Sequence, residues 1–213
     1  IKKNIKMKNE IVFKESGYYK KNIKFFSNNL KKILKQNKIN FKNATILDFG
    51  CGNCLLHKYL KFKKIFLYDL EHGYYNNNYL KKTKTFKTVK EIKNFKGKFD
   101  IILLNSVIQY IKPDDLKKIL IILSKKINKN GLIILSDIPE KSRLNEILSF
   151  KELFNNLKVL IYFATKPRYL KYSFFYYQKD YLKKLLSRRN LDFSVKENLN
   201  FSKSRYTLIV KKN

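Results

Sequence analysis

The residues of this chain best suited to chemistry lie in one short segment, residues 45–54. A short apolar run there leads into Asp48, and Gly50 and Gly52 follow within four residues. A buried strand that enters a glycine turn and then a helix is how parallel α/β sheets hold nucleotide-like ligands, because glycines let backbone N–H groups approach the ligand. A dinucleotide fingerprint would place glycine or alanine where this chain has Leu55, so a nicotinamide cofactor is disfavoured.

A second acid stands at the expected end of the next strand. Residues 65–68 are apolar or aromatic, and Asp69 follows them directly. An acid at about 20 residues beyond the glycine turn suits a ribose, because one carboxylate accepts hydrogen bonds from both ribose hydroxyls. Asp69 is therefore the candidate ribose-binding residue.

Asp48 with the glycines after it, together with Asp69, resembles the class I S-adenosylmethionine-dependent methyltransferases, over roughly residues 40–213. The resemblance implies S-adenosylmethionine as the cofactor, with Asp48 near its cationic amino-acid end. The family's usual third glycine is replaced here by Cys54. The cofactor-binding residues that the resemblance implies come from the turn, the strand ends and an aromatic pair before the first helix: Asp48, Gly50, Cys51, Gly52, Asp69, Leu70, Asn105 and Tyr19.

A continuous apolar run over residues 101–104 predicts a central parallel strand buried on both faces. It leads into Asn105-Ser106-Val107-Ile108 and then Gln109-Tyr110. In the resembled family this loop faces the substrate, and enzymes that methylate base amines or glutamine amides commonly carry (Asn/Asp)-Pro-Pro-aromatic there. This chain lacks that sequence and looks more like the small-molecule methyltransferases, although Gln109-Tyr110 stands where some of them have a histidine base.

The catalytic residues cannot be assigned from the sequence, but two are candidates. Asp137 follows a predicted fifth strand, residues 132–135, at the end where open α/β sheets place their chemistry. It would orient an acceptor hydroxyl or take its proton, or it would only cap a loop. Tyr110, in the loop after the fourth strand, is the second candidate.

No metal is expected, although two cysteines and two histidines offer zinc-ligand side chains. Cys51 and Cys54 belong to the glycine turn, and His57 is expected on the helix that follows. The position of both cysteines within the turn also argues against a disulfide framework, so a cytoplasmic location is expected. No apolar run approaches the ~18 residues that a membrane span needs.

The formal net charge of +32 would suit nucleic acid or another anionic surface. Almost all of this charge is lysine, whereas nucleic-acid sites favour the planar guanidinium of arginine. The lysines are also spread along the whole chain. A solvated basic surface is therefore the favoured interpretation, with an RNA or DNA footprint as the alternative.

The alternation of strand and helix patterns predicts an α/β fold. We expect a Rossmann-like, seven-stranded, mostly parallel sheet with an antiparallel last strand, helices on both faces and a lid insertion before the sixth strand. Residues 1–15 are expected to be a leader that is poorly ordered or peripheral and residues 16–213 a single methyltransferase domain, with residues 140–177 as the substrate lid. The expected helices lie at about residues 23–36, 113–130 and 178–189, and the later strands at 85–89, 101–104, 132–135, 192–197 and 206–210.

The predicted function is transfer of a methyl group from S-adenosylmethionine to a small-molecule or sugar-like acceptor, at oxygen. The partner would then be a small molecule or a glycan precursor. An RNA methyltransferase that uses the lysine-rich surface is one alternative. A scaffold that binds the cofactor without catalysis is another, because no catalytic base is evident. The sequence does not indicate an oligomeric state.

Overall fold

The structure is a computed structural model that describes residues 17–52, 54–70, 83–140, 175–187, 191–199 and 205–212. The expected leader and most of the expected lid, residues 141–174, lie outside the described residues. Those two predictions therefore stay predictions.

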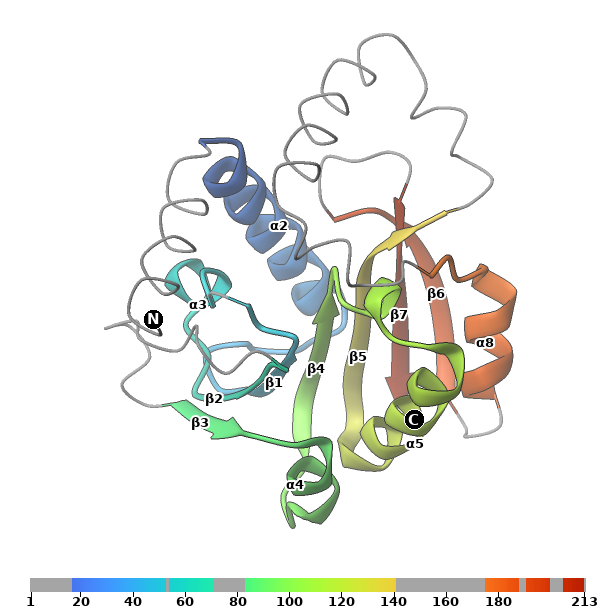
Figure 1. Cartoon of the computed structure of the whole chain (residues 1–213). Helices are drawn as coiled ribbons and strands as arrows, with labels where there is room; N and C mark the ends of the chain where they lie inside the picture. The colour runs from blue at the N-terminus through green and yellow to red at the C-terminus, as the bar shows by residue number, and fades with distance from the viewer. Residues whose placement is uncertain are drawn as a thin grey trace, which may run out of the picture.

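Within the described residues, seven strands form one sheet in the order β3-β2-β1-β4-β5-β7-β6 (Figure 1). The strands β1 to β5 pair in parallel, and β7 is antiparallel to both β5 and β6. This topology confirms the predicted Rossmann-like sheet with its antiparallel closing strand. The strands are β1 (Thr45–Phe49), β2 (Lys64–Tyr68), β3 (Thr83–Phe86), β4 (Phe99–Asn105), β5 (Ile127–Pro139), β6 (Leu191–Glu197) and β7 (Arg205–Lys212).

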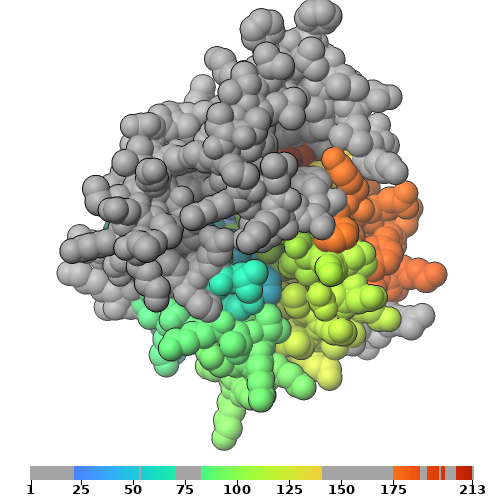
Figure 2. Space-filling model, viewed as in Figure 1, coloured from blue at the N-terminus to red at the C-terminus, as the bar shows by residue number. Residues whose placement is uncertain are grey.

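Helices cover both faces of the sheet, because alternate strand residues point to opposite faces. Ile101 and Leu103 of β4 pack with α2 (Gly17–Gln36) and α3 (Leu56–Tyr59). Ile102 and Leu104 pack with the helices of the other face (Figure 1). Those helices are α4 (Val89–Asn94), α5 (Pro113–Lys126) and α8 (Lys179–Ser187), whose side chains form adjoining parts of the surface in Figure 2.

The helix predicted before the first strand is confirmed and is longer than expected. Phe26, Leu30, Ile33 and Leu34 recur at helical spacing, and all four are buried on the sheet. This burial holds α2 across the sheet from β1 to β5 and closes one side of the fold.

The strand predicted at residues 85–89 is wrong at its carboxyl end, because β3 ends at Phe86 and Thr88 instead starts α4. The Thr88 hydroxyl accepts from the backbone N–H of Glu91 at 3.2 Å, and the Glu91 carboxylate accepts from the backbone N–H of Lys87 at 3.0 Å. This capping box satisfies one N–H of the first turn of α4, and its second hydrogen bond holds the residue before the N-cap. Its sequence signal, Thr-x-x-Glu, begins at Thr88 inside the segment predicted as a strand and ends at Glu91, two residues beyond it.

The prediction that Asn130-Gly131 ends the helix after the fourth strand is also wrong. That helix, α5, ends at Lys126, and Ile127 pairs at once with Phe99 of β4. Asn130 has a φ of 61° and lies within β5, where the pairing with β4 shifts register. Asn130 and Gly131 therefore form an irregularity within β5. The strand starts earlier in the sequence than predicted because Ile127 is buried in the sheet.

Candidate active site

The glycine turn lies at the carboxyl end of β1 and is fixed to the neighbouring strand. The backbone N–H groups of Gly50 and Cys51 donate to the carbonyl of Tyr68 at 2.7 and 3.2 Å. Gly50 has a φ of 78°, and a Cβ placed there would lie 2.3 Å from Cγ2 of Val107 in the loop after β4. The turn therefore holds the ends of β1, β2 and β4 together, and only glycine permits this approach.

Asp69, at the carboxyl end of β2, lies against the same turn. Its Oδ2 accepts a hydrogen bond from the backbone N–H of Gly52 at 2.8 Å. The following residue, Leu70, exposes 73% of its surface. The structure thus brings together the two segments that the sequence assigned to the body and the ribose of the cofactor.

Asp48 is buried within β1 and is paired with a residue that the sequence did not indicate. Its Oδ2 lies 2.8 Å from Nε2 of His57, and both residues are almost fully buried. Nδ1 of His57 has no hydrogen-bond partner among the described residues. The pair links β1 to the short helix α3 directly behind the glycine turn.

The loop after β4 presents polar groups at the same edge of the sheet. Oδ1 of Asn105 and Oε1 of Gln109 are buried and have no hydrogen-bond partner within the described part of the chain. Ser106 has a φ of 56°, and its backbone N–H donates to the carbonyl of Ser136 at 3.0 Å. These two oxygens are hydrogen-bond acceptors at the edge of the sheet where the glycine turn lies.

Asp137 lies inside β5, beyond the predicted end of that strand, and is the centre of a hydrogen-bond network. The Ser106 hydroxyl donates to its Oδ2. Nδ2 of Asn198 donates to its Oδ1 at 2.9 Å, and Nη1 of Arg205 lies 3.1 Å from its Oδ2. The carboxylate therefore joins the end of β5 to the loop after β4 and to the beginning of β7.

Two predicted site residues, Tyr110 and Tyr19, take no part in the hydrogen bonds described above. Tyr110 belongs to the 3₁₀ helix η2 (Ile108–Tyr110) and is half exposed. Tyr19 lies within α2, but its side chain falls outside what the structure describes. The geometry so far links the turn to Asp69, Asp48 to His57, and Ser106 to Asp137.

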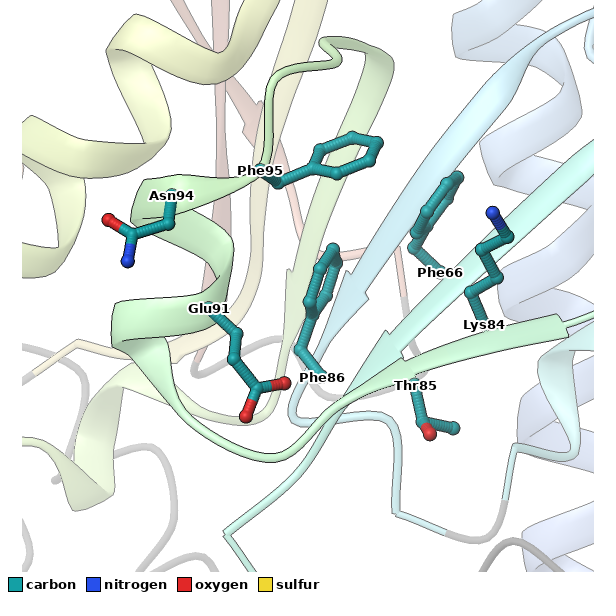
Figure 3. Close-up of a pocket in the computed structure, with 7 residues that line it drawn as sticks. All are labelled: Phe66, Lys84, Thr85, Phe86, Glu91, Asn94 and Phe95. Atoms are coloured by element: carbon teal, nitrogen blue, oxygen red, sulfur yellow. The ribbon is translucent and has the colours of Figure 1, made fainter.

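A separate hollow of about 420 Å³ lies on the α4 face of the sheet, between β2, β3 and α4 (Figure 3). Phe66, Phe86 and Phe95 form its apolar floor, and the rings of Phe66 and Phe86 stack at 5.6 Å. The Glu91 carboxylate on its rim serves the capping box of α4. The hollow includes none of the predicted site residues, so it is distinct from the candidate site.

Comparison with known proteins decides the family. The family model described as a methyltransferase domain matches residues 17–194, which include every described element from α2 to α8. The chain belongs to this methyltransferase family.

Solved methyltransferases share the fold. An S-adenosylmethionine-dependent methyltransferase from Clostridium acetobutylicum is 18% identical, with a TM-score of 0.66 over 100% of this chain and 98% of that one. Magnesium protoporphyrin IX methyltransferase from Synechocystis with bound SAH is 12% identical, with a TM-score of 0.61 over 93% and 89%. No curated protein matches the chain.

The methyltransferase uses S-adenosylmethionine, and its strand-end residues fit that cofactor. The open space beside Gly52 allows a close approach to the backbone, the Asp69 carboxylate is an acceptor for hydroxyls, and the buried Oδ1 of Asn105 is an acceptor for a cation or N–H group. No helix within the described segments is long and apolar enough to span a membrane.

Four residues of this site, namely His57, Ser106, Asn198 and Arg205, were not predicted from the sequence. His57 was considered only as a zinc ligand, and its pairing with Asp48, nine residues away, follows no simple spacing. Ser106 and Arg205 reach Asp137 from 31 and 68 residues away. No local sequence pattern indicates contacts between residues so far apart in the chain. The pairing of β7 with β5 places Arg205 near Asp137, but this follows only once the strand order is known.

Proposed function

We propose that this methyltransferase transfers the methyl group to an oxygen of a small-molecule or sugar-like acceptor. The observation that carries the proposal is the hydrogen bond from the Ser106 hydroxyl to Asp137, next to the loop after β4. A hydroxyl that donates to a carboxylate keeps its own lone pairs for an incoming O–H group. Such a pair suits an alcohol acceptor, whose proton must be removed during the transfer.

The cofactor site in this proposal consists of the turn and the three strand ends beside it. Asp69 accepts from the ribose hydroxyls, and Leu70 lies beside it. Asp48, oriented by His57, supports the turn near the amino-acid end of the cofactor. The residues proposed to contact the cofactor are Asp48, Gly50, Cys51, Gly52, Asp69, Leu70, Asn105 and Tyr19.

S-adenosylmethionine supplies an activated methyl group, so the chain's own residues need mainly to align the acceptor. In the proposal Ser106 accepts the acceptor's hydroxyl proton while passing its own proton to Asp137. Arg205 compensates the charge of the Asp137 carboxylate, and Asn198 fixes its other oxygen. Tyr110 remains the second candidate for the proton acceptor.

The acceptor class is tested by methyl transfer from labelled S-adenosylmethionine to a metabolite extract and to total RNA, each at low and near-physiological salt. Label in metabolites at both salt concentrations supports the proposal. Site-selective label in RNA at the higher salt, with none in metabolites, would favour the RNA alternative. No transfer to either, with cofactor bound, would favour the non-catalytic scaffold.

The proton acceptor is tested by Asp137→Asn, with Tyr110→Phe as the comparison. We expect Asp137→Asn to lower kcat by about 10²–10⁴-fold, the usual contribution of a positioned base. The Kd for S-adenosylhomocysteine should stay within about twofold, since Asn keeps the size of the side chain. A larger loss of kcat from Tyr110→Phe than from Asp137→Asn would make Tyr110 the proton acceptor instead of Asp137.

We also propose a cytoplasmic location, because both cysteines of the chain belong to the turn and form no disulfide framework.

A further inference from the structure

The two cysteines of the chain lie at the ends of one tight turn. The backbone N–H of Cys54 donates to the carbonyl of Cys51 at 2.9 Å, three residues earlier. This is the hydrogen bond that closes a β-turn, whose first and last Cα atoms lie within about 7 Å. Disulfides join Cα atoms about 4.4–6.8 Å apart, so the backbone places these residues at a separation that a disulfide can bridge.

The side chains are also in contact. Cys54 is buried against Leu67 of β2, and Cys51 packs against the same small cluster. The Cys54 thiol donates to the carbonyl of Gly52, which lies between the two cysteines, at 3.6 Å. Both are reduced in the structure, and the sequence contains no third cysteine. Any disulfide within one copy of the chain must therefore join Cys51 to Cys54.

The backbone conformation of Cys54 is one that a cysteine rarely adopts. Cys54 has a φ of 59°, in the left-handed region that favours glycine, and it stands where the family usually has its third glycine. A side chain here costs conformational energy that glycine would avoid. The gain is a second thiol beside Cys51.

We propose that Cys51 and Cys54 are a reversible dithiol and that their oxidation to a disulfide weakens cofactor binding. This inference rests on the proposed cofactor site. Gly52 lies between the two cysteines, and its N–H donates to Asp69, the proposed ribose residue. A disulfide across the turn would restrain the backbone of Gly52, and in the proposal this restraint disturbs its hydrogen bond with Asp69.

The oxidant is a low-molecular-weight disulfide such as glutathione disulfide. The more exposed thiol, Cys51, attacks as its thiolate and forms a mixed disulfide, which releases one glutathione thiol. Cys54 then attacks the Cys51 sulfur and releases the second. The two protein thiols lose two electrons and two protons, one disulfide bond forms in the protein, and the oxidant becomes two thiols.

The surroundings make this reaction slow at neutral pH. The hydrogen bond with Cys54, burial and the Asp48 carboxylate raise the pKa of the Cys51 thiol well above its ordinary value. The thiolate is the attacking form, so the rate of oxidation should rise with pH. Slow thiol–disulfide exchange limits brief oxidation of the turn, but it does not change the equilibrium between the dithiol and the disulfide.

The test equilibrates the full chain in glutathione buffers of graded redox ratio at mildly alkaline pH. Free thiols are counted, the intact mass is measured, and the Kd for S-adenosylhomocysteine is determined by calorimetry at each ratio. We expect two thiols to disappear together, with the loss of two hydrogen atoms, and the Kd to rise by about 5–150-fold, the usual range of coupling between linked sites. Added S-adenosylhomocysteine should in turn shift the midpoint toward more oxidising buffer.

Cys51→Ser and Cys54→Ser are the matched variants. In Cys51→Ser, which lacks the attacking thiol, the Kd should not depend on the redox ratio; in Cys54→Ser, which lacks the resolving thiol, the intact mass should show a glutathione adduct in place of the loss of two hydrogen atoms. In the unsubstituted chain, thiols that stay reduced, a stable glutathione adduct, or a disulfide that leaves the Kd unchanged would each overturn the inference. The thiol count needs no cofactor. A reduced protein that does not bind S-adenosylhomocysteine would therefore contradict the proposed cofactor site, and the count would still decide whether the dithiol forms.

Discussion

Gly50 and Gly52 both have left-handed backbone conformations, but their surroundings differ. A Cβ on Gly50 would lie 2.3 Å from the Val107 side chain, whereas one on Gly52 would meet nothing within 4 Å. The strain of a left-handed alanine, roughly 1–2 kcal/mol, applies to both positions. The steric overlap applies to Gly50 alone and adds about 1–3 kcal/mol.

Gly50→Ala should therefore destabilise the protein by about 2–5 kcal/mol and Gly52→Ala by about 1–2 kcal/mol, measured by urea unfolding. Adding Val107→Ala to Gly50→Ala should recover part of the loss, because it removes the colliding methyl groups. Equal losses from both glycine variants would show that the contact with Val107 is not what requires glycine at position 50.

His57 supports a buried carboxylate, so its removal should be costly. His57→Ala leaves Asp48 without its 2.8 Å partner and should lower the free energy of unfolding by about 2–5 kcal/mol. Lys58→Ala, on the exposed side of the same short helix, should change it by less than about 0.5 kcal/mol. The idea fails if Asp48→Asn combined with His57→Ala costs as much as the sum of the two single changes, measured in one double-mutant cycle.

Asp69 serves the turn and, in our proposal, the ribose. Asp69→Ala should weaken S-adenosylhomocysteine binding by about 1–3 kcal/mol, the usual cost of losing a charged hydrogen-bond partner. Asp69→Asn keeps an acceptor for the Gly52 N–H and should lose less. Asp114→Ala, in the exposed first turn of α5, is the control. Unchanged affinity of Asp69→Ala in calorimetry would show that the ribose assignment is wrong.

At the scale of elements, two tyrosines tie the segment before α8 to the rest of the fold. The Tyr177 hydroxyl donates to the carbonyl of Ile111 after η2, and the Tyr206 hydroxyl of β7 donates to the carbonyl of Tyr177 at 2.7 Å. Burial, with Tyr181 nearby, raises the pKa of Tyr177 to about 12. Burial, with Glu140 and Asp180 nearby, also raises the pKa of Tyr206.

The unfolded chain should then lose these protons near the ordinary pKa of about 10, before the folded protein does. Stability from this source is complete below about pH 10 and falls as the pH rises toward 12. Tyr177→Phe should show a shallower fall of the unfolding free energy over that interval, and Tyr177→Phe with Tyr206→Phe a shallower one still. A wild-type free energy that stays constant from pH 10 to 12 would contradict the assignment.

The elements were predictable where the sequence pattern is local. The period of α2 and the apolar run of β4 gave both elements with only their ends in error. The boundary between α5 and β5 was misplaced because Asn130-Gly131 is a good helix stop in isolation. What decided it was the pairing of Ile127 with Phe99, a contact across the sheet that no local pattern contains. The same limit applies to the candidate site: Asp48 and Asp69 were predicted as site residues from their positions at strand ends, whereas Arg205 was not predicted.

At the scale of the whole molecule, the charge of +32 makes binding to nucleic acid expected whatever the substrate is. We predict that RNA binding by this chain weakens steeply as salt rises, since each neutralised phosphate releases counterions. S-adenosylhomocysteine binding should change far less, because its proposed contacts are partly buried. Titrations of both ligands at low and near-physiological salt measure this difference. RNA affinity that persists at the higher salt would indicate a specific site.

The position of β7 between β5 and β6 bears on how the protein is made. Within the described strands β6 neighbours only β7, yet β6 is synthesised before β7. Until residues 205–212 emerge, β6 has no neighbour in the sheet and the edge of β5 that pairs with β7 stays open. Exposed strand edges invite pairing with other chains. During synthesis the nascent chain thus passes through a stage in which a chaperone has two open strand edges to protect, and the arrival of β7 closes both at once.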